Sequence, residues 1–159
     1  DLMIHDIDII LTFVGSEVRS LHASGAAVVS DHCDIANARI EFQTGCVANI
    51  TASRISTKGQ RKIRLFQKNG YIAVDFAKRE MMHIEQTDKA NNAIIPGMEV
   101  HQACFLEGDA LEAELRSFTG AVRDQRPPVV TGRMGYQALA VALNVMEQID
   151  EAARRFGDA

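Results

Sequence analysis

The spacing of apolar residues changes twice along the chain, and this change most limits the folds available to it. From Leu2 to Val14 apolar residues recur at three- and four-residue steps, with Gly15 as a stop, which predicts a largely buried helix. Over residues 17–102 apolar and polar residues mostly alternate, which is typical of strands with one covered face. After Gly108 the helical spacing returns. The order helix, strands, helices predicts an α+β fold.

Turn residues divide the strand region into hairpins. Thr44-Gly45 and Asn69-Gly70 each separate two alternating runs, so we expect the flanking strands to pair antiparallel. The result is an open, mostly antiparallel sheet with helices packed on one face and the other face available for oligomerisation. A polar loop is expected over residues 86–97. The expected strands lie within residues 17–29, 36–43, 46–55, 63–66, 71–76, 81–85 and 98–102.

Two helices are expected after the strands. The first follows Gly108, has acidic residues near its start, and ends at Arg126-Pro127-Pro128. The last begins at about Gly132 or Met134 and ends near Arg155. The apolar face of the first comprises Leu111, Leu115, Phe118 and Val122, and the expected buried stripe of the last comprises Met134, Leu139, Leu143, Met146 and Ile149.

Composition excludes several classes of protein. The 159 residues are 47% hydrophobic and 24% charged, which is ordinary for one folded domain. A net charge of -4 offers no broad basic field for nucleic acid, and no apolar run reaches the ~20 residues that cross a membrane. Cys33, Cys46 and Cys104 lack the spacing of a disulfide framework or a zinc site, so we expect a cytoplasmic protein without a metal. His83 and His101 are single histidines in strands and are expected to be ordinary polar residues.

The first helix carries the strongest candidate site. Asp1 and His5 are four residues apart, which places a carboxylate beside an imidazole on one helix surface, and Asp8 and Thr12 continue the same stripe. Such a pair suits general acid/base catalysis, because a neighbouring carboxylate orients the ring that moves the proton. The alternative is a surface polar pair at a helix start. Asp8 either faces substrate or pairs with a nearby basic group.

Arg54 is a second candidate. It ends a predicted strand beside the polar residues 56–60, where a guanidinium could bind a carboxylate, a phosphate or sugar hydroxyls. The competing interpretation is a surface or interface salt bridge.

Several segments together resemble the C-terminal domain of the Gfo/Idh/MocA oxidoreductase family. The short DxxxH pattern is weak alone, but its place ahead of this order of elements makes the resemblance specific. It extends over nearly the whole chain, and the abrupt start at Asp1 suggests a piece of something longer. The resemblance is carried by Asp1 to His5, the strand from Ala36, residues 44–53 (TGCVANITAS), Gly70-Tyr71-Ile72 and residues 128–132 (PVVTG).

The resemblance implies a function that the residues alone do not. In that family an N-terminal Rossmann domain binds NAD or NADP, and the C-terminal domain forms most of the substrate pocket. By this likeness residues 1–159 form the substrate-binding and oligomerisation domain, with Asp1 contacting substrate and His5 as the acid/base. The chain has no GxGxxG fingerprint and lacks the family's catalytic lysine, so the Rossmann domain is absent and the chain alone is expected to be inactive.

Substrate and partners follow from the same likeness. The expected substrate is a sugar, a sugar nucleotide or a cyclitol, oxidised at a hydroxyl, and the expected assembly is a homodimer or homotetramer formed through the sheet face. A protein of another class remains open: a non-catalytic oligomerisation module, or a small-ligand binding module, that uses the open sheet face.

Overall fold

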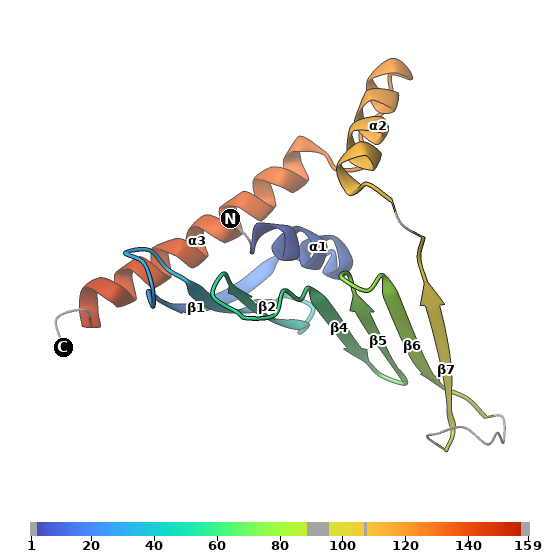
Figure 1. The fold of residues 1–159 in the computed structure, drawn as a ribbon, viewed down its shortest axis with the longest axis horizontal. Helices are drawn as coiled ribbons and strands as arrows, with labels where there is room; N and C mark the ends of the chain where they lie inside the picture. The colour runs from blue at the N-terminus through green and yellow to red at the C-terminus, as the bar shows by residue number, and fades with distance from the viewer. Residues whose placement is uncertain (1–2, 89–95, 107, 157–159) are drawn as a thin grey trace. The chain divides into compact units, whose positions relative to one another are not determined.

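The computed structural model describes residues 3–88, 96–106 and 108–156 (Figure 1). The chain divides into two compact units: the first unit, Asp1–Ser56 with Leu115–Ala159, and the second unit, Thr57–Glu114. The elements are α1 (Ile4–Val14), β1 (Val18–Ala26), β2 (Ile35–Phe42), β3 (Val47–Ser53), β4 (Lys62–Gln67), β5 (Gly70–Asp75), β6 (Glu80–Gln86), β7 (Met98–Cys104), α2 (Ala110–Arg123) and α3 (Gly132–Phe156).

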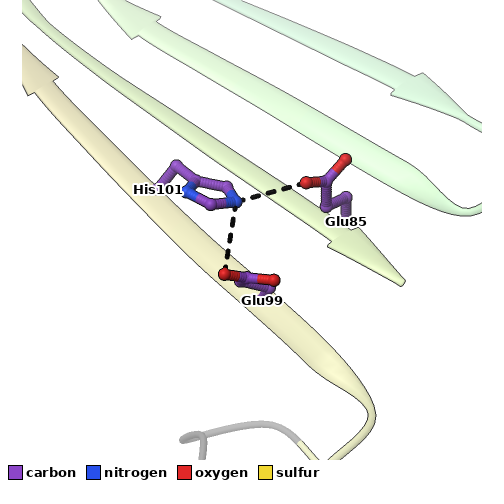
Figure 2. Close-up of side chains that lie close together, drawn as sticks. All are labelled: Glu85, Glu99 and His101. Atoms are coloured by element: carbon purple, nitrogen blue, oxygen red, sulfur yellow. Dashed lines mark hydrogen bonds and ion pairs between the residues drawn. The ribbon is translucent and has the colours of Figure 1, made fainter. Parts of the chain in front are cut away.

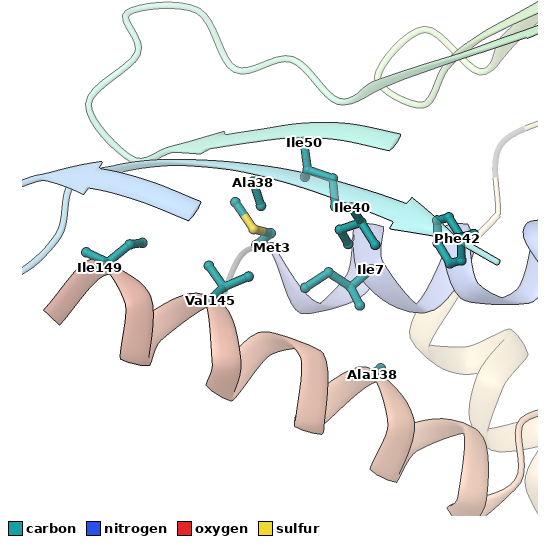
Figure 3. Close-up of a cluster of buried hydrophobic side chains, with 9 residues drawn as sticks. All are labelled: Met3, Ile7, Ala38, Ile40, Phe42, Ile50, Ala138, Val145 and Ile149. Carbon is teal, nitrogen blue, oxygen red and sulfur yellow. The ribbon is translucent and has the colours of Figure 1, made fainter. Parts of the chain in front are cut away.

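The first unit is a three-stranded antiparallel sheet covered on one face by two helices. The strand order is β1-β2-β3, with Leu21 opposite Ile40 and Ile40 opposite Ala48. The alternating residues Ala38, Ile40 and Phe42 of β2 are buried, and they face α1 and α3 (Figure 3). The expected helices on one sheet face are therefore present in this unit. Its buried core consists of Met3, Ile7, Ala38, Ile40, Phe42, Ile50, Ala138, Val145 and Ile149.

Helix α3 buries a different face from the one its sequence predicted. Leu139, Leu143 and Met146 are 48%, 54% and 56% exposed, whereas Ala138 and Val145 are buried. Helix α3 contacts α1 and β1 through the face that carries Ala138 and Val145, and of the predicted stripe Ile149 alone lies in the core. Gln148 fixes this contact, because its side chain accepts a hydrogen bond from the backbone N–H of Ala23 and donates one to the carbonyl of Leu21.

The other face of this sheet is polar. Arg39 donates hydrogen bonds to Asn49 and to Glu41, both 3.3 Å long, and Thr51 donates one to Asn37 at 2.7 Å. These side chains are exposed or half-buried. The face carries a hydrogen-bonded polar surface rather than an apolar one.

The second unit contains a four-stranded antiparallel sheet of order β4-β5-β6-β7. Ile63, Leu65, Ile72, Val74 and Met81 share one face of it by register and are half-buried. Among the residues that the structure describes in this unit, none is fully buried. The sheet exposes part of both faces and has no closed core of its own.

The α+β class and the antiparallel pairing predicted from the sequence are confirmed, and every expected strand and helix is present to within a few residues. The strands form two sheets rather than one. Across the described parts of the chain, no helix is both long and apolar enough to cross a membrane.

Gly15 ends α1 in a left-handed conformation. Its φ is 58°, and its N–H donates to the carbonyl of Leu11. We expect Gly15→Ala to lower the free energy of unfolding by about 1 kcal/mol, because a Cβ disfavours this conformation. Urea titration followed by circular dichroism measures this change. Gly59→Ala is the matched control, since Gly59 has no positive φ and open space around it; an equal loss in both variants would contradict the explanation.

Candidate functional site

Helix α1 has a buried face and a polar face. Ile7 lies fully buried against the sheet, with Ile4 and Leu11 packed beside it, which turns His5 and Thr12 outward to solvent. Asp8 is half-buried three residues after His5. Asp1 lies outside the described residues. The structure therefore places His5 on an accessible helix surface, where it can reach a ligand.

A cavity of about 740 Å³ opens beside the start of α1 within the first unit. Its wall is mostly apolar, with contributions from Met3 and Ile4 of α1 and from Val145 and Ile149 of α3. This volume and lining are typical of small-molecule sites. The polar residues along it are Asp31, His32, Asp34, Ser53, Arg54 and Asp150.

Asp34 organises the loop that forms one wall of this cavity. Its side chain is fully buried and accepts hydrogen bonds from the backbone N–H groups of Val28, Val29 and Ser30, at 2.8, 2.7 and 3.1 Å. Arg54 donates from Nε to the Asp34 carboxylate and from Nη2 to Ser30 Oγ at 2.6 Å. A loop that would otherwise expose unpaired backbone donors is thereby held in one shape.

The same contacts set the ionisation of Asp34. The backbone N–H groups of Val29 and Val28 hold the pKa of its carboxyl well below the usual value of 3.8, with further lowering from the side chains of Arg54 and Ser30. Burial acts in the opposite direction on this pKa and is outweighed. Asp34 is therefore ionised throughout the neutral range.

The structure brings some of the sequence candidates together and leaves others apart. Arg54 and the start of α1 line the same cavity, but the Arg54 guanidinium is partly used by Asp34. His5 and Asp8 do not line the cavity; they lie on the same helix that contributes to it. Sequence reasoning missed Asp34, although its place at the end of a short polar run between two strands is typical of an aspartate that binds loop N–H groups.

Comparison with known proteins decides the family. Residues 1–73 match the family model described as the GFO/IDH/MocA C-terminal domain. The chain is 35% identical over 155 residues to UDP-N-acetylglucosamine 3-dehydrogenase of Acidithiobacillus ferrooxidans, covering 98% of this chain and 49% of that protein. The chain belongs to the Gfo/Idh/MocA family.

Other Gfo/Idh/MocA proteins support the assignment. Myo-inositol 2-dehydrogenase of Thermotoga maritima is 26% identical over 160 residues, covering 95% of this chain and 46% of that protein. A solved structure of the Acidithiobacillus ferrooxidans enzyme aligns with a TM-score of 0.86 and 33% identity, over 94% of this chain and 47% of that one. The chain spans about half the length of the curated relatives it matches.

The described residues of this Gfo/Idh/MocA domain do not form a dinucleotide site of the Rossmann type. A dinucleotide site of the Rossmann type needs a parallel strand, a glycine-rich turn and a helix whose N-terminus faces the pyrophosphate. Every strand pair in both sheets is antiparallel, and the chain contains no GxGxxG.

Proposed function

We propose that this chain is the substrate-binding part of an NAD(P)-dependent oxidoreductase that acts on a hydroxyl of a sugar, a sugar nucleotide or a cyclitol. Family membership carries the proposal, together with relatives that are dehydrogenases of UDP-N-acetylglucosamine and of myo-inositol. Asp1 and His5 are the catalytic residues of this proposal, and Asp8 and Arg54 contact substrate. The cytoplasmic location stays a prediction.

His5 has the simplest chemical role. Its imidazole accepts the proton of the hydroxyl that is oxidised, and returns it in the reverse direction. The exposure of His5 supports this role, because a fully packed imidazole could not meet a substrate. In the sequence Asp1 precedes His5 by four residues and Asp8 follows it by three, the spacing of side chains that share one surface of a helix.

The cofactor belongs to an N-terminal Rossmann domain in this proposal. The exposed apolar side chains of α3, Leu139, Leu143 and Met146, support such a partner, because they form an uncovered stripe on a helix of the first unit. The length of the relatives, about twice that of this chain, is consistent with it. No metal is part of this catalytic proposal.

The test is turnover by the complete protein. We expect absorbance at 340 nm to rise when the protein is given NAD or NADP with one member of a panel of UDP-sugars, free sugars and inositols. The 159-residue chain alone should give no turnover with any of them, because it lacks the cofactor site. Turnover by the chain alone, or none by the complete protein across the panel, would contradict the proposal.

Arg54 is expected to act on substrate affinity rather than on the chemical step. Arg54→Lys keeps the charge but loses the forked donor set that binds Asp34 and Ser30 and faces the cavity. We expect KM to rise about tenfold with kcat nearly unchanged, because the substrate would lose roughly one hydrogen bond to a charged group. Arg39→Lys, on the polar outer face of the sheet, is the control. A fall in kcat with KM unchanged would argue against this role.

A second candidate function, assembly of a homodimer or homotetramer, is favoured by the second unit. On one face of its sheet β4 and β5 carry half-buried apolar residues, and none of the residues described in this unit is fully buried, so a second copy packed over these two strands would cover them. The polar outer face of the first unit's sheet is a poorer surface for this purpose. Analytical ultracentrifugation should show an oligomer at tens of micromolar protein; a monomer there would remove this candidate.

A further inference from the structure

Two histidines and two glutamates form a square on β6 and β7 that the proposed catalysis does not use. His83 pairs with His101 and Glu85 pairs with Glu99 in the antiparallel register. Residues two apart on a strand share a face, so all four side chains lie on the same side of the second unit's sheet. We propose that this square is a binding site for a divalent cation of the zinc class.

The distances fit direct coordination. His101 Nε2 lies 3.2 Å from Glu85 Oε1 and 3.8 Å from Glu99 Oε1, and Figure 2 shows both carboxylates converging on the ring. The ligand atoms of the three residues all lie within 4.8 Å of one another. A tetrahedral zinc ion with bonds of ~2.0–2.1 Å separates its ligands by roughly 3.3 Å, so small side-chain shifts suffice.

The electrostatics also favour a cation. Glu85 and Glu99 face each other directly across the strands, which is unfavourable for two carboxylates. On the other side of β6, the register partners of His83 and Glu85 are Ile72 and Gly70, which bring no positive charge, and β7 is the edge of the sheet. A dication between the carboxylates removes their repulsion, and imidazole with carboxylate is a ligand set that zinc accepts.

The site is open to solvent and leaves one coordination position of a tetrahedral ion unfilled. The side chains of His101, Glu85 and Glu99 are 50%, 47% and 38% exposed, so an ion can enter from solvent. Three protein ligands leave a fourth position open. His83 is the nearest further imidazole, with its ring centroid 6.0 Å from that of His101. Bound metal would join β6 to the edge strand β7 next to the Gln86–Met98 pair that ends the ladder.

The sequence concealed this site because its ligands come from two strands, each of which supplies only one histidine and one glutamate, two residues apart. Our expectation of no metal rested on spacing within single segments, whereas the square is assembled by strand register across 18 positions from His83 to His101. Metal sites built across paired strands need the register before they become visible.

Isothermal titration of the full chain with Zn²⁺ alone tests the proposal. The three exposed cysteines are first alkylated, because thiolates bind zinc independently. We expect one saturable zinc site per chain with a dissociation constant below about 100 µM. His101→Ala and Glu85→Gln should each raise this dissociation constant at least about tenfold. Far-UV circular dichroism checks that each variant stays folded.

Glu80→Gln is the matched control, because Glu80 lies on the same strand and its side chain points to the opposite face. It should leave the zinc affinity unchanged. The proposal is overturned by the absence of saturable binding, by binding that survives both His101→Ala and Glu85→Gln, or by an equal loss in Glu80→Gln.

Discussion

His5→Ala in the complete protein should lower kcat by about 10²-fold or more, the usual effect of removing a general acid/base. The residue lies on the exposed face of α1, away from the buried Ile7, so the loss should come from chemistry rather than from unfolding. Steady-state kinetics at saturating cofactor and substrate measures it, and thermal melting should show a nearly unchanged transition.

A matched variant separates this effect from the effect of removing any exposed histidine. His22→Ala removes an exposed imidazole from β1, outside the polar face of α1, and should leave kcat within about twofold. If His5→Ala kept normal turnover, or if both variants lost activity equally, His5 would have no role in proton transfer.

Asp34→Asn should destabilise the first unit strongly at neutral pH. The amide cannot carry the charge that Arg54 and three backbone N–H groups stabilise, and it places a hydrogen donor where the carboxylate accepts. We expect the melting temperature to fall by at least about 5 °C at pH 7. The cavity wall should loosen with it, so substrate KM should rise in the complete protein.

The sign of the pH dependence gives a sharper test. Because the pKa of Asp34 is lowered in the folded chain, its charge stabilises the fold at pH values above 3.8, the usual pKa of the group. This stabilisation is lost progressively as the pH falls below that value. The difference in melting temperature between wild type and Asp34→Asn should therefore shrink between pH 5 and pH 3. Asp31→Asn, an exposed change in the same loop, should differ little from wild type at either pH. A difference for Asp34→Asn that stays constant with pH would contradict the explanation.

The local elements were predictable because each has its own period. The alternation in β2 and the turn at Gly45 place Ile40 and Phe42 on the covered face, and both are buried. Helix α3 was harder, because it has two apolar faces, and which one is buried depends on how closely it packs on α1 and β1. The larger residues Leu139 and Leu143 suggested the wrong face.

The candidate site was predictable only where it lies within one helix. His5 and Asp8 keep the spacing that the sequence shows, whereas the pairing of Arg54 with Asp34 joins residues 20 positions apart through a loop shape that no periodicity encodes. Arg54 was therefore recognised as a candidate without its partner. The same limit applies to the square of His83, Glu85, Glu99 and His101, which depends on register.

The most direct test of the central claim is one distance in a crystal structure of the complete protein with NAD(P) and a substrate bound. We predict that a ring nitrogen of His5 lies within about 3.2 Å of the hydroxyl oxygen that is oxidised. A substrate bound with this oxygen far from α1, beyond the reach of His5 directly or through one water molecule, would contradict the account.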